Sequence, residues 1–148
     1  MLISLMKEEE IAQVAELERQ CFSEPWTEQG LRESFARPEY LFLTAKENDQ
    51  VVGYAGLYQV FDEGDITNIA VLPEARGKGL GTALTKELLH VGAQRKIQAF
   101  TLEVRVGNVS AIHIYEKLGF VSEGIRKGFY DKPKEDALIM WNRQMSAQ

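Results

Sequence analysis

The stretch from Asn68 to Gly81, which reads NIAVLPEARGKGLG, limits the fold more than any other part of the chain. Its first residues are apolar and end in the β-branched Val71, as at the end of a buried strand. Pro73 ends that strand, three alternating glycines follow, and apolar residues recur at helical spacing from Leu80 onward. The stretch therefore predicts a strand, a glycine-rich turn and the beginning of a helix.

A turn of this kind can hold an anion. The first N–H groups of a helix have no partner within the helix, and the helix dipole favours negative charge at that end. Arg76 and Lys78 add positive charge beside the turn, which we therefore interpret as a cradle for a pyrophosphate. The P-loop pattern is excluded because no Lys-Ser or Lys-Thr pair follows a glycine here, and the dinucleotide pattern is excluded because the glycines alternate. Taken alone, the turn fits a flexible surface connection equally well.

Composition restricts the class of protein. A chain of 148 residues, 45% hydrophobic and 26% charged, suits one soluble domain over residues 1–148. No apolar run is long enough to cross a membrane, and the single cysteine, Cys21, excludes an internal disulfide and fits the cytoplasm. The net charge of −5 argues against a nucleic-acid binder and permits a basic peptide or protein partner.

Periodicity and turn residues predict the order of the elements. Helices are expected at 7–22, 27–35, 80–95 and 109–118, and strands at 2–5, 40–46, 50–60, 65–71, 99–106, 120–125 and 136–141. The hairpins favour antiparallel pairing, and the strand–helix–strand units favour local parallel pairing. The predicted fold class is α/β (α+β), with a mixed, mostly antiparallel central sheet flanked by helices.

Two patterns carry a resemblance to a known family. The pattern R-x-x-G-x-G, read at Arg76, Gly79 and Gly81, resembles the coenzyme A pyrophosphate loop of the GCN5-related N-acetyltransferase (GNAT) superfamily, and N-I-A-V-x-P resembles its fourth strand. The second pattern is L-E-V-R-x-x-N-x-x-A-x-x-x-Y-x-x-x-G-F, which begins at Leu102. Together with P-W at Pro25 and E-D-A before the last strand, these motifs resemble more narrowly the ribosomal-protein alanine N-acetyltransferases, over essentially the full length.

Acetyl transfer to an amine needs a base for the ammonium and an acid for the leaving thiolate. Glu103, flanked by Leu102 and Val104 in a predicted strand, is the candidate base, and Tyr115 on the following helix is the candidate acid. Considered alone, a strand glutamate more often faces solvent, or pairs with Arg105 or with a neighbouring strand, and a helix tyrosine more often packs in the core. The resemblance favours the catalytic roles.

The resemblance also implies the binding residues. The expected contacts with acetyl-CoA are Ile69, Ala70, Val71, Arg76, Gly77, Lys78, Gly79, Leu80, Gly81, Thr82 and Asn108. Trp26 and Tyr130 are the expected substrate contacts, although surface packing explains Tyr130 nearly as well. Relatives often carry paired tyrosines where this chain has Phe129 and Tyr130, so one polar contact with the peptide is missing. His90 and His113 have no partner at metal-ligand spacing, and no metal is expected.

The implied activity is acetyl-CoA-dependent transfer to the N-terminal amine of a protein, directly within a ternary complex. The implied substrate is the N-terminal alanine of small-subunit ribosomal protein eighteen, a basic partner for an acidic enzyme. We expect a cytoplasmic monomer or weak dimer with no direct contact to nucleic acid or membrane. Two alternatives stay open: the same chemistry on a lysine side chain or small amine, and a non-catalytic acyl-CoA-binding module.

Overall fold

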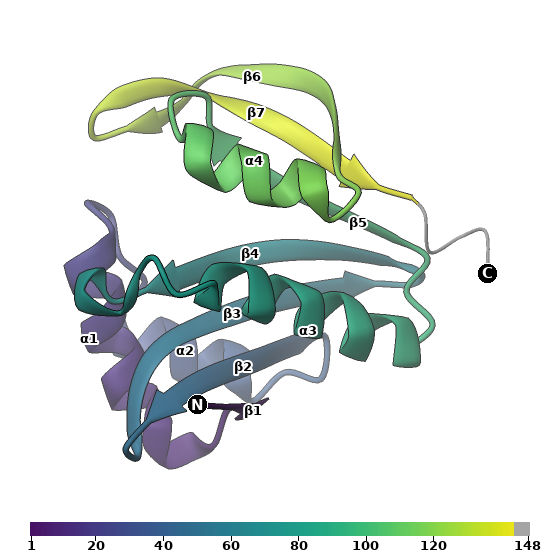
Figure 1. The fold of residues 1–148 in the computed structure, drawn as a ribbon. Coiled ribbons are helices and arrows are strands. Elements are labelled where there is room, and N and C mark those ends of the chain that lie inside the picture. Colours follow the sequence, from purple (N-terminus) through teal and green to yellow (C-terminus); the bar gives the residue numbers. More distant parts are fainter. Residues whose placement is uncertain (144–148) are drawn as a thin grey trace.

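In the computed structural model, residues 1–143 are described, and their strands form one seven-stranded sheet with helices on both faces (Figure 1). The strand order is β1-β2-β3-β4-β5-β7-β6, and every neighbouring pair is antiparallel except β4 and β5. This confirms the predicted fold class. The strands are β1 (Leu2–Leu5), β2 (Tyr40–Glu47), β3 (Gln50–Val60), β4 (Glu63–Val71), β5 (Ala99–Arg105), β6 (Val121–Asp131) and β7 (Lys134–Asn142).

The helices divide between two apolar cores. α1 (Ile11–Cys21) and α2 (Glu28–Phe35) cover one face of the sheet and share a core with Phe42 and Tyr54. α3 (Leu80–Gln94) and α4 (Val109–Lys117) cover the other face, around a core that includes Leu57 and Phe100. Short 3-10 turns, η1 (Glu8–Glu10) and η2 (Pro73–Ala75), precede α1 and α3. The side chains of β3 and β4 alternate between the two cores, as expected for strands buried on both faces, whereas β5 contributes only to the core with α3 and α4.

The sheet opens along one line in its middle. β4 and β5 are paired only through three positions, the last of which joins Asp65 to Thr101. Beyond that position the two strands separate, and β5, β6 and β7 with α4 diverge from the rest of the sheet (Figure 1). Beyond that position, the backbone N–H and C=O groups of β4 and β5 that face each other's strand are not paired in the sheet. The fold therefore separates the β1–β4 part of the sheet from the β5–β7 part at this end.

A bulge in β4 borders this gap. Gly56 pairs with Asn68 and Leu57 pairs with Ile66, which leaves Thr67 as an extra residue. A side-chain carbon added to Gly56 would lie 2.7 Å from Thr67 Oγ1 and 2.9 Å from the Phe42 ring. A small residue is therefore required at Gly56, because the bulged part of β4 approaches β3 closely there.

Several predicted boundaries need correction. The last two strands are much longer than the predicted 120–125 and 136–141, so Phe129 and Tyr130 lie within β6 and not in a loop. Charged residues interrupt the apolar pattern there, and an edge strand tolerates them because much of its surface meets solvent. The strand predicted at 65–71 begins two residues earlier, at Glu63. The helix predicted at 7–22 begins with the 3-10 turn η1 before α1.

Candidate active site

The predicted glycine cradle forms as a strand, a turn and a helix N-terminus. Gly77 and Gly79 have φ values of +82° and +79°, a region in which a side chain is strained, and nothing lies within 4 Å of where a Cβ would be added. Gly79 is the N-cap of α3 and provides no side-chain acceptor. The first N–H groups of α3 therefore remain available, and the open backbone leaves room for a phosphate group.

A groove of about 550 Å³ runs from this turn along β4 to α4. The structure brings almost all of the predicted acetyl-CoA contacts together in its wall: Ile69, Ala70, Val71, Arg76, Gly77, Gly79, Leu80, Gly81, Thr82 and Asn108. Lys78 is exposed and is not among the lining residues. The bare turn, the uncapped helix and the groove that continues from them fit the pyrophosphate and pantetheine parts of coenzyme A.

Arg76 makes contacts that the sequence did not indicate. Its Nε donates to the Val71 carbonyl at 2.9 Å, and its Nη2 lies 3.7 Å from Cys21 Sγ. The Cys21 thiol donates to the same carbonyl at 3.4 Å. Burial raises the pKa of the Cys21 thiol, which the Arg76 guanidinium opposes. The guanidinium therefore holds the end of β4 in place next to the glycine turn.

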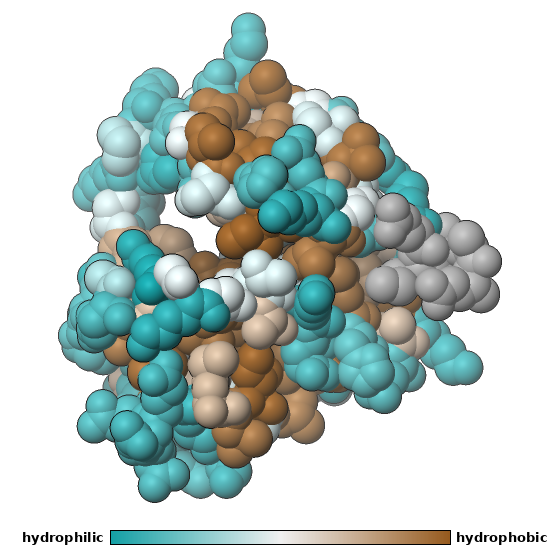
Figure 2. Space-filling model, viewed as in Figure 1, coloured by the Kyte–Doolittle hydropathy of each residue, from teal (hydrophilic) through white to brown (hydrophobic). Residues whose placement is uncertain are grey.

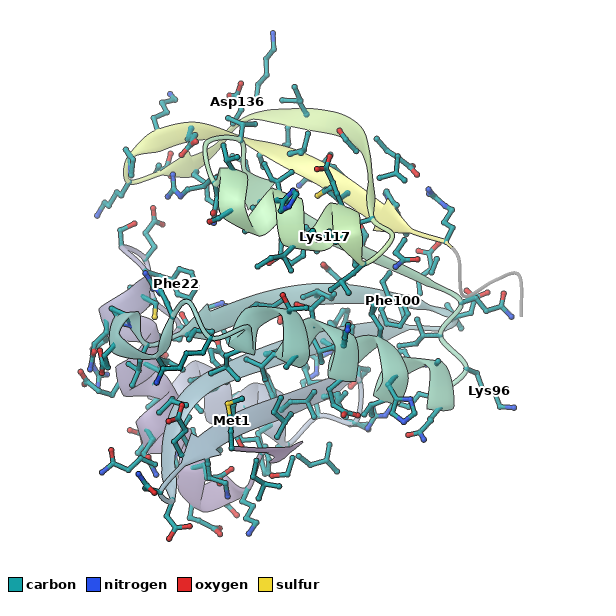
Figure 3. The ribbon with its side chains drawn as sticks, in the orientation of Figure 1. Met1, Phe22, Lys96, Phe100, Lys117 and Asp136 are labelled. Atoms are coloured by element: carbon teal, nitrogen blue, oxygen red, sulfur yellow. The ribbon has the colours of Figure 1, made fainter. Side chains whose placement is uncertain are left out.

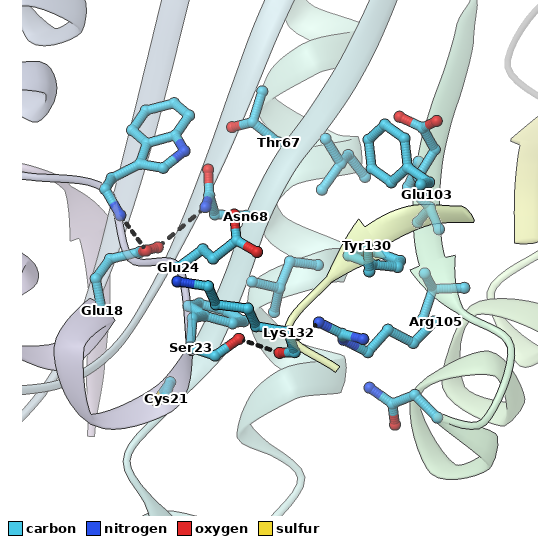
Figure 4. A pocket seen from close by; sticks show the side chains of 18 of the residues that line it. Glu18, Cys21, Ser23, Glu24, Thr67, Asn68, Glu103, Arg105, Tyr130 and Lys132 are labelled. Atoms are coloured by element: carbon cyan, nitrogen blue, oxygen red, sulfur yellow. Dashed lines mark hydrogen bonds between the residues drawn. The ribbon is translucent and has the colours of Figure 1, made fainter. Parts of the chain in front are cut away.

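A second cavity of about 630 Å³ lies in the gap between β4 and β5. Figure 2 shows the surface hollowed between the two halves of the molecule. Residues of β4, β5 and the segment between α1 and α2 line the cavity, and the β6–β7 turn closes part of it. Phe22, just after α1, lies beneath the β6–β7 hairpin (Figure 3). The Ser23 hydroxyl donates a hydrogen bond to the Lys132 carbonyl and so connects the segment after α1 with the β6–β7 turn (Figure 4).

Glu103 lies on the wall of this second cavity. Phe100, Leu102 and Val104 point into the core with α3 and α4, so the alternation of β5 turns Glu103 to the opposite face. Glu103 Oε2 lies 3.0 Å from Nε of Arg126 on β6, an ion pair without the alignment of a hydrogen bond. The expected alternative of pairing with Arg105 does not occur, because Arg105 pairs with Glu135 at 3.2 Å. Glu103 is thus a partly exposed carboxylate beside a cavity.

Tyr115 is placed where the groove and the cavity meet. It lines both, and its ring packs edge-on against Phe120 at a centroid distance of 5.9 Å. Burial, with a smaller contribution from Tyr130, raises the pKa of Tyr115 to about 12. The phenol therefore remains protonated at neutral pH and can donate a proton.

Asn108 begins the helix that carries Tyr115. Its Oδ1 accepts a hydrogen bond from the Ala111 N–H at 3.3 Å and so caps α4. Asn108 also lines both the groove and the cavity. The residue thus has a structural function in addition to its position at the predicted cofactor site.

The two predicted substrate contacts lie at the second cavity, together with Phe129. Trp26 packs edge-on against Tyr40 and Phe42, each at 6.4 Å between ring centroids. The Arg105 guanidinium lies 4.2 Å from the centroid of the Tyr130 ring. Burial raises the pKa of Tyr130, and the charge of Glu103 raises it further.

Glu18 is a site residue that sequence reasoning missed. It is 1% exposed and accepts hydrogen bonds from the Trp26 N–H at 2.9 Å and from Asn68 Nδ2 at 3.0 Å (Figure 4). It also accepts a hydrogen bond from the Tyr54 hydroxyl. Burial raises the pKa of its carboxyl group, and the three hydrogen bonds oppose that shift. The only signal in the sequence is a charged residue within the apolar stripe of α1.

Among residues 1–143, no helix is long and apolar enough to span a membrane. In the same residues, no three His, Cys, Asp or Glu side chains gather in a way that could hold a metal ion. His90 and His113 are exposed on α3 and α4.

Comparisons with known proteins agree with this geometry. The chain is 38% identical over 137 residues to a candidate ribosomal protein bS18-alanine N-acetyltransferase of Bacillus subtilis, covering 92% of this chain and 91% of that one. It is 36% identical over 142 residues to the ribosomal protein bS18-alanine N-acetyltransferase of Haemophilus influenzae, covering 94% and 96%.

The fold is also that of a solved relative. The crystal structure of the ribosomal-protein-S18-alanine N-acetyltransferase of Escherichia coli superimposes with a TM-score of 0.88 at 31% identity, covering 95% of this chain and 92% of that one. The model of the acetyltransferase (GNAT) family matches residues 11–120, a range that contains the glycine turn, Glu103 and Tyr115. The predicted superfamily is therefore confirmed, and the chain belongs to the GNAT family of acetyltransferases.

Proposed function

We propose that this chain is an acetyl-CoA-dependent N-α-acetyltransferase that modifies the N-terminal alanine of ribosomal protein bS18 in the cytoplasm. The observation that carries the proposal is the meeting of the groove and the second cavity. Both are lined by the same five residues, Cys21, Phe22, Ile69, Asn108 and Tyr115. A thioester in the groove and an amine in the cavity would therefore meet beside Tyr115.

The chain's own groups fit the proton transfers that the reaction needs. Acetyl-CoA supplies the acetyl thioester. Glu103 takes a proton from the substrate ammonium, directly or through a water, and the freed amine attacks the thioester carbon. As the carbon–sulfur bond breaks, Tyr115 gives its proton to the sulfur, and the nitrogen loses its second proton, which returns the Tyr115 phenolate to the phenol. The products are the acetylated amine and coenzyme A, and the proton taken by Glu103 is released to water. No covalent acetyl-enzyme is required.

The backbone of β4 offers a place for the charge that develops on the carbonyl oxygen. From Ile69 to Val71 this strand is paired with β3 on one side, and beyond Asp65 it has no pairing with β5 on the other. An N–H group on the open side could donate to the oxygen as the tetrahedral intermediate forms. The unpaired side of β4 therefore supports a role for the Ile69–Val71 backbone in holding the thioester of acetyl-CoA.

The choice of substrate rests on the relatives and on charge. The Haemophilus influenzae and Escherichia coli relatives are named for the N-terminal alanine of the same ribosomal protein. The net charge of −5 favours encounter with a basic protein. Phe129 lacks the hydroxyl that relatives often have at this position. This chain should therefore differ from them in its preference for the peptide residues that follow the N-terminal alanine.

Two peptides test the proposal. One carries the N-terminal sequence of bS18 with a free alanine amine, and the other has that amine blocked and an internal lysine free. Each is incubated with enzyme and acetyl-CoA and examined by mass spectrometry. Acetylation of the first peptide alone is expected. Acetylation of the second alone would identify a lysine or small-amine enzyme, and coenzyme A binding without turnover on either would identify a binding module.

A further inference from the structure

Unpaired acceptor oxygens concentrate at the second cavity. Among the side chains of residues 1–143, four buried oxygen atoms have no hydrogen-bond donor, and three of these belong to residues that line this one cavity. They are Thr67 Oγ1, Asn68 Oδ1 and Glu103 Oε2. A buried acceptor without a donor destabilises the protein, and a ligand N–H group would relieve that cost. Glu103 Oε2 has the charge of Arg126 beside it, at 3.0 Å, whereas the two oxygens from β4 have neither a donor nor a charge partner. These two adjacent acceptors in one cavity wall point to a ligand rich in N–H groups.

Glu18 determines which end of the Asn68 amide serves as the acceptor. Glu18 Oε2 accepts from the Tyr54 hydroxyl and acts as an acceptor toward Asn68 too, so the amide nitrogen of Asn68 faces it, at 3.0 Å. The amide oxygen then points away from Glu18 and has no donor. Figure 4 shows Asn68 between Glu18 and Thr67. Glu18 is itself held by the Tyr54 hydroxyl and the Trp26 N–H, so the amide orientation is fixed by two other elements.

The β4 bulge brings Thr67 to the same face as Asn68. Thr67 Oγ1 lies close to the bare face of Gly56 and to Phe42, which belongs to the core beneath α1 and α2. Asn68 faces that side too, through its bond to Glu18 on α1. In a regular strand, two consecutive side chains would point to opposite faces. The extra residue therefore creates a pair of adjacent acceptors that regular pairing would not allow.

We propose that Thr67 Oγ1 and Asn68 Oδ1 accept hydrogen bonds from the amine end of the peptide substrate, with Glu18 as the positioning residue for Asn68. This inference rests on the proposed function. The amine end of a peptide offers three ammonium N–H groups and the first amide N–H, and Glu103 faces it from the other side of the gap. Both oxygens are closed to water in the empty protein, so the approach of the substrate requires a small side-chain movement.

A binding cycle between enzyme and ligand tests this. Dissociation constants are measured by calorimetry, with coenzyme A present, for two peptides. One is the bS18 peptide with its N-terminal alanine, and the other has a propionyl group in place of that alanine and so lacks only the amine. The Kd of the propionyl peptide divided by the Kd of the alanine peptide measures how much the amine contributes to binding. Thr67→Val and Asn68→Ala should each reduce this ratio by about tenfold or more, the effect of a hydrogen bond to a charged group.

Arg32→Ala is the control, because the Arg32–Glu28 ion pair is exposed on α2 and neither residue lines the cavity. It should leave the ratio within about twofold of the wild-type value, whereas Glu18→Ala, which removes the acceptor that orients the Asn68 amide, should lower the ratio as Asn68→Ala does. Thr67→Val keeps the size of the side chain. If Asn68→Ala does not fold, the ratio measured for Thr67→Val is the test of the inference. Unchanged ratios in Thr67→Val and in every folded Asn68 or Glu18 variant would overturn the inference. Failure of the wild type to acetylate the alanine peptide would instead overturn the proposed function.

Discussion

Arg126 reaches across β7 to Glu103, and its Nε lies 3.0 Å from Glu103 Oε2 although β6 and β5 are not paired with each other. The guanidinium therefore stands beside the carboxylate that we propose as the base. A substrate ammonium that approaches Glu103 has to come close to this second positive charge. The ion pair both orients the carboxylate and competes with the substrate for it.

Replacing Arg126 separates these two effects. Arg126→Ala should lower the KM for the alanine peptide several-fold, because repulsion of the ammonium is removed, and should change kcat by less than about tenfold. Glu103→Gln should lower kcat by about 100-fold or more with coenzyme A binding retained. Arg32→Ala, which removes a comparably exposed ion-paired arginine from α2, is the control and should alter neither constant. A large loss of kcat in Arg126→Ala would mean that Arg126 itself takes part in the chemistry.

Tyr115→Phe tests the proposed acid. Because the pKa of Tyr115 is raised to about 12, the phenol stays protonated across the working pH range and cannot produce an alkaline limb there. The substitution should lower kcat by about 100-fold or more without changing the shape of the pH–rate profile between about pH 7 and 10. Steady-state rates across that range, together with calorimetric binding of coenzyme A, provide the measurement. Equal rates for Tyr115→Phe and the wild type would remove the assigned role.

The glycine cradle should be sensitive at Gly79. Its φ of +79° is in the left-handed region, so Gly79→Ala should lower the free energy of unfolding by about 1–2 kcal/mol. The added methyl group also enters the open space at the N-terminus of α3, and we expect the Kd of coenzyme A to rise about tenfold. Gly124→Ala is the control, because a Cβ there would be 3.9 Å from Ile139 and no left-handed backbone is involved. Unchanged coenzyme A binding in a folded Gly79→Ala protein would contradict the cradle.

Local patterns predicted the parts of the site that depend on local geometry. The strand, turn and helix around Gly79 follow from a break in apolar periodicity and a run of glycines. The outward direction of Glu103 follows from the alternation of Phe100, Leu102 and Val104. In both cases a few neighbouring residues determine the conformation, so one sequence was sufficient.

The contacts that cross the sheet could not be predicted in this way. The pairing of Arg126 with Glu103 depends on β7 lying between β5 and β6, which no local pattern indicates. Glu18 looked like one more position in a helix stripe, and its partners Tyr54 and Asn68 are 36 and 50 residues away in the chain. The length of β6 was missed because polar residues interrupt its apolar pattern at an exposed edge.

Glu18 also predicts how stability depends on pH. Its pKa is raised in the folded protein, above the value of about 4.3 for an unfolded glutamate, because burial disfavours the charge. A raised pKa means that the contribution of Glu18 to stability is fully present below the unfolded value and is lost as the pH rises through the folded value. Urea unfolding of the wild type and of Glu18→Gln, at intervals upward from about pH 4, measures this contribution. Relative to Glu18→Gln, the wild type should lose stability with rising pH up to the folded pKa and then remain level. A difference that is flat with pH, or that grows in favour of the wild type, would show that the three hydrogen bonds outweigh burial and hold the pKa at or below its ordinary value.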